Sequence, residues 1–311
     1  MSRVLLLGVP RSGTTWVGRA LGATDGAAYV NEPDGFGEPL ALGIMLKYGE
    51  HPHIAPGDKA ADYERLWSSA FGGGLPSRTL RDKAARFIYD RTPLDDRRAA
   101  RATGNIPMRL RIVSSLAQPF AAAPDARHVV VKTVQGCLST DWILEHFEAR
   151  VILIERNPFN VLSSWRDLGF VREGREFDRI ALLARERWGV ERPTIGAPHL
   201  ALQSFFYGVL SASLRESAMR HPEWIQTTHE YLCVESLERF KSLADQVGLE
   251  WGERANAFIT DSDKDGTPFR TMRRSADQPE RWRERLSSEE TQTIRSVLES
   301  FPKGLLADIP Q

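Results

Sequence analysis

The chain has 311 residues, with 41 basic and 41 acidic side chains that give a formal net charge of zero. A balanced charge offers no overall attraction to nucleic acid or to an anionic membrane surface, so any bound anion must be held by a local cluster. No apolar run approaches the ~20 residues of a membrane span, and Cys137 and Cys233 are too few for a disulfide framework or a zinc site. We expect a soluble, cytoplasmic protein.

Strand and helix patterns alternate along much of the chain. Four short apolar runs have the length and β-branched content of buried strands, namely 4–7, 27–30, 128–131 and 151–154. Residues 200–219 then show helical spacing, 224–228 form a weak strand, and 235–247 form an amphipathic helix. This alternation predicts an α/β fold of three layers, with a central, mostly parallel sheet flanked by helices.

The pattern loosens between Glu38 and Ala126, where no run indicates a buried strand and Gly72-Gly73-Gly74 interrupts the chain. We expect residues 1–311 to form a single domain in which about residues 38–126 are a helical, substrate-binding insertion. Within it, segment 78–111 carries ten basic residues against four acidic ones. Two interpretations stay open for this segment: a solvated helical face with i,i+4 ion pairs, or a surface that binds an acidic acceptor.

The segment GVPRSGTTW, from Gly8 to Trp16, directly follows the first predicted strand. It fits the phosphate-loop pattern G-x-x-x-x-G-K-[ST] except at the lysine. A loop of small residues between a strand and a helix aims backbone N–H groups and the positive helix end at one point, where an anion binds. A nucleoside triphosphatase would also need the lysine and an acidic magnesium ligand, and only Glu155 could stand in for that acid.

The PRSGTTW part of this loop resembles the 5′-phosphosulfate loop of the sulfotransferases, whose sulfuryl donor is 3′-phosphoadenosine 5′-phosphosulfate (PAPS). The resemblance implies a fold similar to the nucleotide kinases. It places Arg11 beside the bridging oxygen and the transferring group, and makes Trp16 a stacking platform for adenine. The donor-binding residues that it implies here are Arg11, Ser12, Gly13, Thr14, Thr15 and Trp16.

A second segment, ERNPFNVLSSW from Glu155 to Trp165, resembles the 3′-phosphate motif of the same family. The resemblance implies that Arg156 and Ser164 hold the 3′-phosphate. The local pattern also predicts a helix start, because Asn157 can cap a helix and Pro158 suits its first turn.

Two later segments resemble family motifs less closely. PFRTMRRSADQPERW, residues 268–282, is similar to the late basic loop that closes over the 3′-phosphate, and implies Arg273 or Arg274 without choosing between them. THEYL, residues 228–232, implies that His229 lies near adenine. The alternatives are solvated loop charges and a structural histidine.

The motifs named so far do not include a general base, the residue that removes the proton from the acceptor hydroxyl. Small-molecule sulfotransferases use the histidine of a Lys-Thr-His stretch, but the matching stretch here is Lys132-Thr133-Val134, and valine cannot accept a proton. In the tyrosyl-protein and related glutamate-using branch, a glutamate follows the loop arginine by twenty-one positions, which implies Glu32. Its alternative role is that of a capping acid before Pro33.

Other candidate bases are His51, His53, His128 and Asp34, none of which sits at an equivalent family position. Lys132 matches a lysine that contacts the leaving group or the sulfuryl oxygens.

The resemblance therefore implies a PAPS-dependent sulfotransferase that moves a sulfuryl group to a hydroxyl by in-line displacement, with Glu32, Arg11 and Lys132 as catalytic residues and no metal. A small-molecule, glycan or lipid acceptor would each fit. The sequence identifies neither the acceptor nor the oligomeric state. An ATP-dependent small-molecule kinase and a non-catalytic nucleotide-binding protein remain the alternatives.

Overall fold

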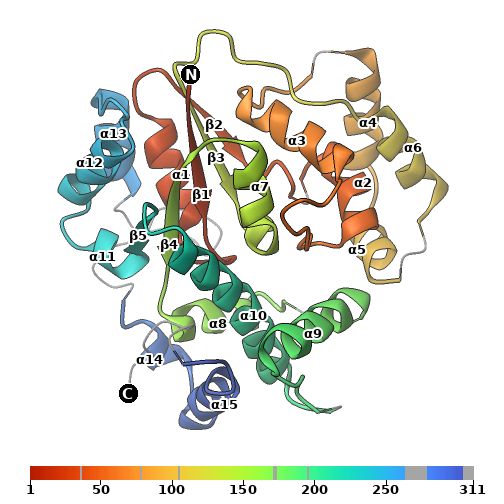
Figure 1. Cartoon of the computed structure of the whole chain (residues 1–311), viewed down its shortest axis with the longest axis vertical. Helices are drawn as coiled ribbons and strands as arrows, with labels where there is room; N and C mark the ends of the chain where they lie inside the picture. The colour runs from red at the N-terminus through yellow and green to blue at the C-terminus, as the bar shows by residue number, and fades with distance from the viewer. Residues whose placement is uncertain are drawn as a thin grey trace.

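A five-stranded parallel sheet forms the centre of the molecule (Figure 1). The computed structural model describes residues 1–35, 37–77, 79–103, 106–170, 174–194, 196–262 and 279–303. The strands are β1 (Ser2–Leu7), β2 (Ala27–Asn31), β3 (His128–Thr133), β4 (Arg150–Glu155) and β5 (Ile225–Thr228). They lie in the order β2-β3-β1-β4-β5. All five predicted strands are confirmed.

Helices cover both faces of the sheet, because each strand turns alternate apolar side chains to opposite sides. One face, which includes Leu6 and Val130, packs on α1 (Thr14–Gly22), α11 (His229–Cys233), α12 (Ser236–Gln246) and α13 (Glu253–Ser262). The core on the other face, which includes Leu5 and Val131, is formed with α7 (Thr140–His146), α8 (Pro158–Asp167), α9 (Arg175–Trp188), α10 (His199–Arg220), α14 (Trp282–Arg285) and α15 (Ser288–Leu298). The three-layer prediction is confirmed, as are the predicted helices at 200–219 and 235–247.

The segment between β2 and β3 is helical over most of its length. It forms α2 (Pro39–Tyr48), α3 (Ala61–Phe71), α4 (Leu80–Asp90), α5 (Leu94–Thr103) and α6 (Met108–Leu116). Helix α3 joins the main core through Trp67. Helices α2, α4, α5 and α6 share a smaller apolar cluster of their own, centred on Leu110, and lie together beside the sheet (Figure 1). The triple glycine ends α3, and Gly74 lies so close to β2 that a Cβ there would come within 2.4 Å of Val30.

Several basic side chains of segment 78–111 are engaged within this insertion. Arg86 pairs with Glu38 at 3.0 Å and with Asp82 at 2.9 Å. Arg91 lies 3.6 Å above the ring of Phe87. These contacts favour the structural interpretation for these two arginines.

Within the described residues, none of the helices combines the length and the apolar character that crossing a bilayer requires.

Close packing of α1 on β2 brings the loop before α1 near the end of β2. Gly18 and Gly22, four residues apart on one face of α1, both lie against Tyr29. A Cβ at Gly22 would come within 2.5 Å of the Cβ of Tyr29, a group too near the backbone to move aside.

Gly22→Ala tests this close approach. Alanine is the better helix former by about 0.8–1.0 kcal/mol, so without a steric conflict the change would not destabilise α1. We expect the free energy of unfolding in urea to fall by about 1–3 kcal/mol. Gly37→Ala is the matched control, because a Cβ there meets nothing within 4 Å, and should change stability by less than about 0.5 kcal/mol. Equal effects of the two changes would contradict the close packing.

Candidate active site

The carboxyl ends of the five strands bring the predicted site residues to one edge of the sheet. Arg11 follows β1, Glu32 follows β2, Lys132 is next to last in β3, Arg156 follows β4 and His229 follows β5. Ligands of open α/β sheets bind in the crevice outside this edge. Segments that are far apart in sequence are therefore neighbours here.

The loop after β1 is curled so that it can hold an anion. Arg11 and Gly13 have left-handed backbones, with φ of 73° and 96°, and α1 begins at Thr14. The first N–H groups of a helix have no partner within the helix and point outward with its positive end. Ser12 Oγ is buried and makes no hydrogen bond to any described residue. A bound anion would satisfy these donors.

His229 and Trp16 lie beneath the loop. A Cβ on Gly13 would come within 2.4 Å of His229 Cδ2, so only glycine fits against that ring. Trp16 is 8% exposed; it packs edge-on against Phe240 and donates from Nε1 to Ser262 Oγ at 2.9 Å. Contact of Trp16 or His229 with adenine stays a prediction.

The two segments that the sequence predicts to bind phosphate are joined directly. Arg11 Nε donates to Ser164 Oγ at 3.1 Å, and Arg156 Nη1 donates to the backbone oxygen of Arg11 at 3.0 Å. Helix α8, which carries Ser164, starts as predicted: the side chain of Asn157 accepts from the N–H of Phe159 at 2.9 Å. The loop after β1 and the helix after β4 thus form one polar network.

Arg285 is a further cation at this network, and the sequence motifs did not identify it. Burial and the nearby charge of Arg285 lower the pKa of Arg11. Arg285 donates from Nε to Asp167 Oδ2 at 3.2 Å and from Nη2 to the backbone oxygen of Ser163 at 3.4 Å. The one signal was its place in the basic segment RWRER, residues 281–285, which overlaps the end of the late-loop motif.

Glu32 and Lys132 form an ion pair at the ends of β2 and β3. Lys132 Nζ donates to Glu32 Oε1, and the Glu32 N–H donates to the backbone oxygen of Lys132 at 2.7 Å. The lysine side chain is 2% exposed, but that of the glutamate is 30% exposed. The carboxylate is therefore the member of the pair that an acceptor can reach.

Asp34 is a buried carboxyl beside this pair. The Thr133 hydroxyl lies 2.8 and 2.9 Å from its two oxygens. Burial raises the pKa of Asp34 to about 7; the Thr133 hydrogen bond opposes this shift and the charge of Glu32 adds to it. Asp34 was named only as an alternative base, and its burial leaves it no contact with solvent through which to meet an acceptor.

The histidine alternatives occupy three different places. His128 begins β3, at the opposite edge of the sheet, and its Nδ1 lies 2.6 Å from Ser2 Oγ. His128 is thus at the other end of β3 from Lys132. His51 is buried, with Nδ1 3.5 Å from Glu176 Oε1, and His53 lines the cavity described below.

Glu155, the one acid that could serve as a magnesium ligand, forms an ion pair with helix α10. Arg215 holds both of its carboxylate oxygens, with Nη2 at 2.7 Å from Oε2. A metal ion would have to displace this paired guanidinium. Arg273 and Arg274 lie outside the described residues.

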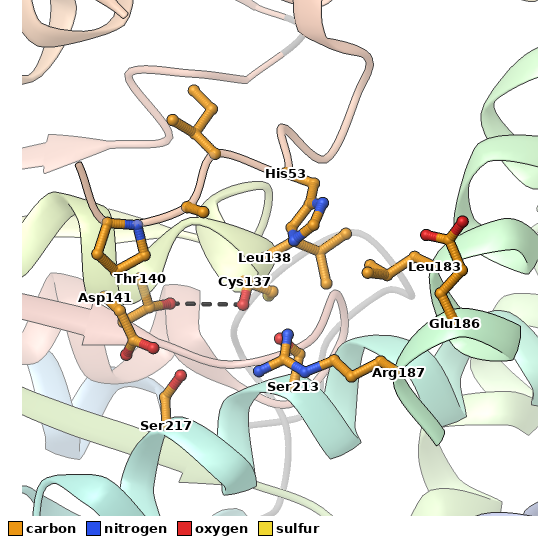
Figure 2. A pocket seen from close by; sticks show the side chains of 13 residues that line it. His53, Cys137, Leu138, Thr140, Asp141, Leu183, Glu186, Arg187, Ser213 and Ser217 are labelled. Atoms are coloured by element: carbon orange, nitrogen blue, oxygen red, sulfur yellow. Dashed lines mark hydrogen bonds between the residues drawn. The ribbon is translucent and has the colours of Figure 1, made fainter. Parts of the chain in front are cut away.

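A cavity of about 360 Å³ opens beside the turn that follows β3. Its walls are the loop 53–56, the 3-10 turn η1 (Gly136–Leu138) with the start of α7, and faces of α9 and α10. Figure 2 shows His53 and Arg187 pointing into it from different elements, with Ser213 and Ser217 along α10. Burial and the charge of Arg187 lower the pKa of His53, which favours its neutral form.

The family of the chain follows from comparison with known proteins. A profile described as "Sulfotransferase family" matches residues 3–192, more than half of the chain. The chain therefore belongs to the sulfotransferase family and is an enzyme of the transferase class. A search of curated proteins finds no match.

Several solved structures are similar in outline. The sulfotransferase domain of the olefin synthase from Synechococcus PCC 7002 is 14% identical, with a TM-score of 0.48 and coverage of 96% of this chain and 94% of that one. The sulfotransferase domain from the curacin biosynthetic pathway is 13% identical, with a TM-score of 0.46 and coverage of 96% and 97%. Sulfotransferase STF1 from Mycobacterium tuberculosis H37Rv is 14% identical, with a TM-score of 0.41 and coverage of 83% and 70%.

Asp34→Asn tests the burial of the Asp34 carboxyl. Its pKa rises from the ordinary 3.8 to about 7 in the folded protein, so the folded protein keeps a proton that the unfolded chain releases. Relative to the variant, the wild-type free energy of unfolding should be highest below about pH 4. It should fall by up to about 4 kcal/mol as the pH rises through 7.

Urea unfolding of the wild type and of Asp34→Asn between about pH 4 and pH 8 measures this difference. The exposed Asp245→Asn is the control, and its stability should follow the wild type across the range. If the Asp34→Asn curve also ran parallel to the wild type, the raised pKa would be wrong.

Proposed function

We propose that this sulfotransferase uses PAPS as its donor and transfers the sulfuryl group to a hydroxyl of an acceptor by in-line displacement. The observation that carries the proposal is the Arg11–Ser164–Arg156 network, which joins two anion-binding segments at the sheet edge. The Glu32–Lys132 pair ends the two neighbouring strands. A donor with a 5′-phosphosulfate and a separate 3′-phosphate needs two such anion sites.

The residues present fit this donor. The buried hydroxyl of Ser12 and the N-terminus of α1 offer donors to the 5′-phosphosulfate. Arg156 stands directly before α8, so an anion near it would also lie close to a helix N-terminus. When bound, PAPS supplies the sulfuryl group and a phosphate leaving group. The scheme requires no metal ion.

Each catalytic residue then has a distinct task. Glu32 accepts the acceptor's proton as its oxygen attacks, because its carboxylate is the exposed member of the ion pair. Lys132 orients that carboxylate through their ion pair. Arg11 and Lys132 place positive charge where negative charge grows on the leaving oxygen. Removal of one such preorganised group typically lowers the rate by about 10²–10³.

The insertion at about 38–126 is proposed to help bind the acceptor. His53 to Pro56 of this insertion form one wall of the 360 Å³ cavity, and residues of η1, α7, α9 and α10 form the others. Hydroxyl and charged side chains alternate there with Leu138 and Leu183. Such a mixed lining suits a ligand with both polar and apolar parts.

The kinase alternative is less well supported. It needs a magnesium ligand, and Glu155 is bound to Arg215. A non-catalytic nucleotide-binding protein would bind the donor product without turnover.

Calorimetry with adenosine 3′,5′-bisphosphate in EDTA tests the donor site. We expect binding without metal, and Arg156→Ala should weaken it by about 2–4 kcal/mol, because a buried charge-assisted contact is lost. Arg150→Ala is the matched control, since Arg150 is the exposed first residue of β4, the strand that Arg156 follows. This change should leave the affinity for the bisphosphate unchanged. Absence of binding to the wild type in EDTA would count against the proposal.

Glu32→Gln tests the general base. Glutamine keeps the size of the side chain and loses its ability to accept the proton, so turnover of labelled PAPS with an acceptor found by screening should fall by about 10²–10⁴. Affinity for the bisphosphate should barely change. The control is Glu38→Gln, since Glu38 lies six residues further along the chain and is paired with Arg86. This variant should retain wild-type turnover. Wild-type turnover by Glu32→Gln, with chemistry rate-limiting, would remove Glu32 from this role.

A further inference from the structure

One hydroxyl group ties together the turns that follow β2 and β3. Thr133 Oγ1 donates its proton to the Asp34 carboxyl and accepts the N–H groups of Gln135 and Gly136, each at 3.0 Å. Asp34 and Thr133 are 1% and 0% exposed, so water does not compete for these bonds. The turn that carries Asp34 is therefore fastened to the end of β3 by a dry contact.

This contact lies on the opposite face of the sheet from Lys132. Successive side chains of a strand point to opposite faces, and Val130 packs in the core with α1 while Val131 packs in the core with α10. Lys132 therefore shares the α1 side, and Thr133 shares the α10 side. The end of β3 holds Glu32 from one face and Asp34 from the other.

Glu32 needs such support because its backbone is left-handed, with φ of 49°. This conformation is uncommon for a residue with a side chain and persists where the surroundings hold it. The Gly35 N–H donates to the Glu32 backbone oxygen at 2.8 Å, and a Cβ on Gly35 would come within 2.7 Å of the Glu32 Cβ. Asp34 lies between these two residues, so its tether to Thr133 anchors the whole turn.

We propose that Asp34 is a positioning residue for sulfuryl transfer, which acts through Thr133 to fix the turn that presents the Glu32 carboxylate to the acceptor. The inference rests on the proposed function of Glu32. Asp34 itself touches no substrate.

Ionisation of Asp34 should strengthen its hydrogen bond to Thr133, although burial makes the ionised form the less stable one overall. The titratable groups that face it are Glu32 on its own turn, Lys132 on β3, Tyr63 on α3 and Cys137 on η1. Burial raises the pKa of both Tyr63 and Cys137, so these two stay neutral near pH 7. Because a hydroxyl donates more strongly to a carboxylate than to a neutral acid, kcat should rise as the pH passes about 7, the pKa of Asp34.

The test compares Asp34→Asn, Thr133→Val and Thr133→Ser. Valine has the shape of threonine without the hydroxyl, whereas serine keeps the hydroxyl. Asp34→Asn and Thr133→Val should lower kcat by about 10- to 100-fold, since misplacement of a reacting group by about 1 Å costs this much. Thr133→Ser should recover most of the kcat lost in Thr133→Val. The Kd of adenosine 3′,5′-bisphosphate should stay within about twofold, because the donor network is untouched.

The pH profile separates positioning from a general structural role. Wild-type kcat should show an inflection near pH 7 that Asp34→Asn lacks. The proposal is overturned if Asp34→Asn keeps wild-type kcat and its inflection, or if Thr133→Ser loses as much kcat as Thr133→Val. Thermal melts identify a variant that does not fold. If Asp34→Asn does not fold, the comparison of Thr133→Val with Thr133→Ser tests the proposal by itself. Absence of label transfer from PAPS by the wild type would instead contradict the proposed function.

Discussion

The parallel pairing of β3 with β1 and β2 is the constraint on which the site depends. Its register sets Lys132 opposite Leu6 on one side and Asn31 on the other. The loop after β1 and the turn after β2 therefore start close to the same level along the sheet, on either side of Lys132. A slip of one residue would turn Lys132 to the α10 face and separate it from Glu32.

The same edge holds two residues in conformations that they would rarely adopt alone. Arg11, Glu32 and Glu235 are the non-glycine residues with positive φ in the described part of the chain. Arg11 is held through its backbone oxygen by Arg156, and Glu32 through its N–H by the end of β3. Residues with strained backbones cluster at functional sites in proteins. Here each is fixed by a contact that comes from a neighbouring strand end.

Local features of the site could be predicted from the sequence. The strands were visible as short apolar runs, and the start of α8 as Asn157 before Pro158, because each depends on adjacent residues. The bond from Arg11 to Ser164 could not be predicted, since it joins positions 153 residues apart. The Thr133–Asp34 contact and the approach of Arg285 depend on packing in the same way. The place of His128 could also be predicted, because it is the first residue of the predicted strand 128–131, whereas ligands bind at the carboxyl ends of such strands.

The helices of the insertion were the least predictable part of the fold. Helices α4, α5 and α6 bury apolar side chains against one another and against Leu42 of α2, whereas the rest of the buried face of α2 joins the main core. The arrangement of these helices therefore depends on contacts between segments that are separate in the sequence. The pairing of Glu155 with Arg215 could not be predicted from the sequence either, because the two residues are 60 positions apart. That pairing bears on the choice between sulfuryl and phosphoryl transfer.

Parallel incubations with ³⁵S-labelled PAPS in EDTA and with γ-³²P-labelled ATP in magnesium, over one acceptor panel, test this choice most directly. The network of Arg11, Ser164 and Arg156, with Glu32 at the same edge of the sheet, predicts transfer of ³⁵S to an acceptor and no transfer of ³²P. Transfer of ³²P alone, dependent on magnesium, would contradict the account.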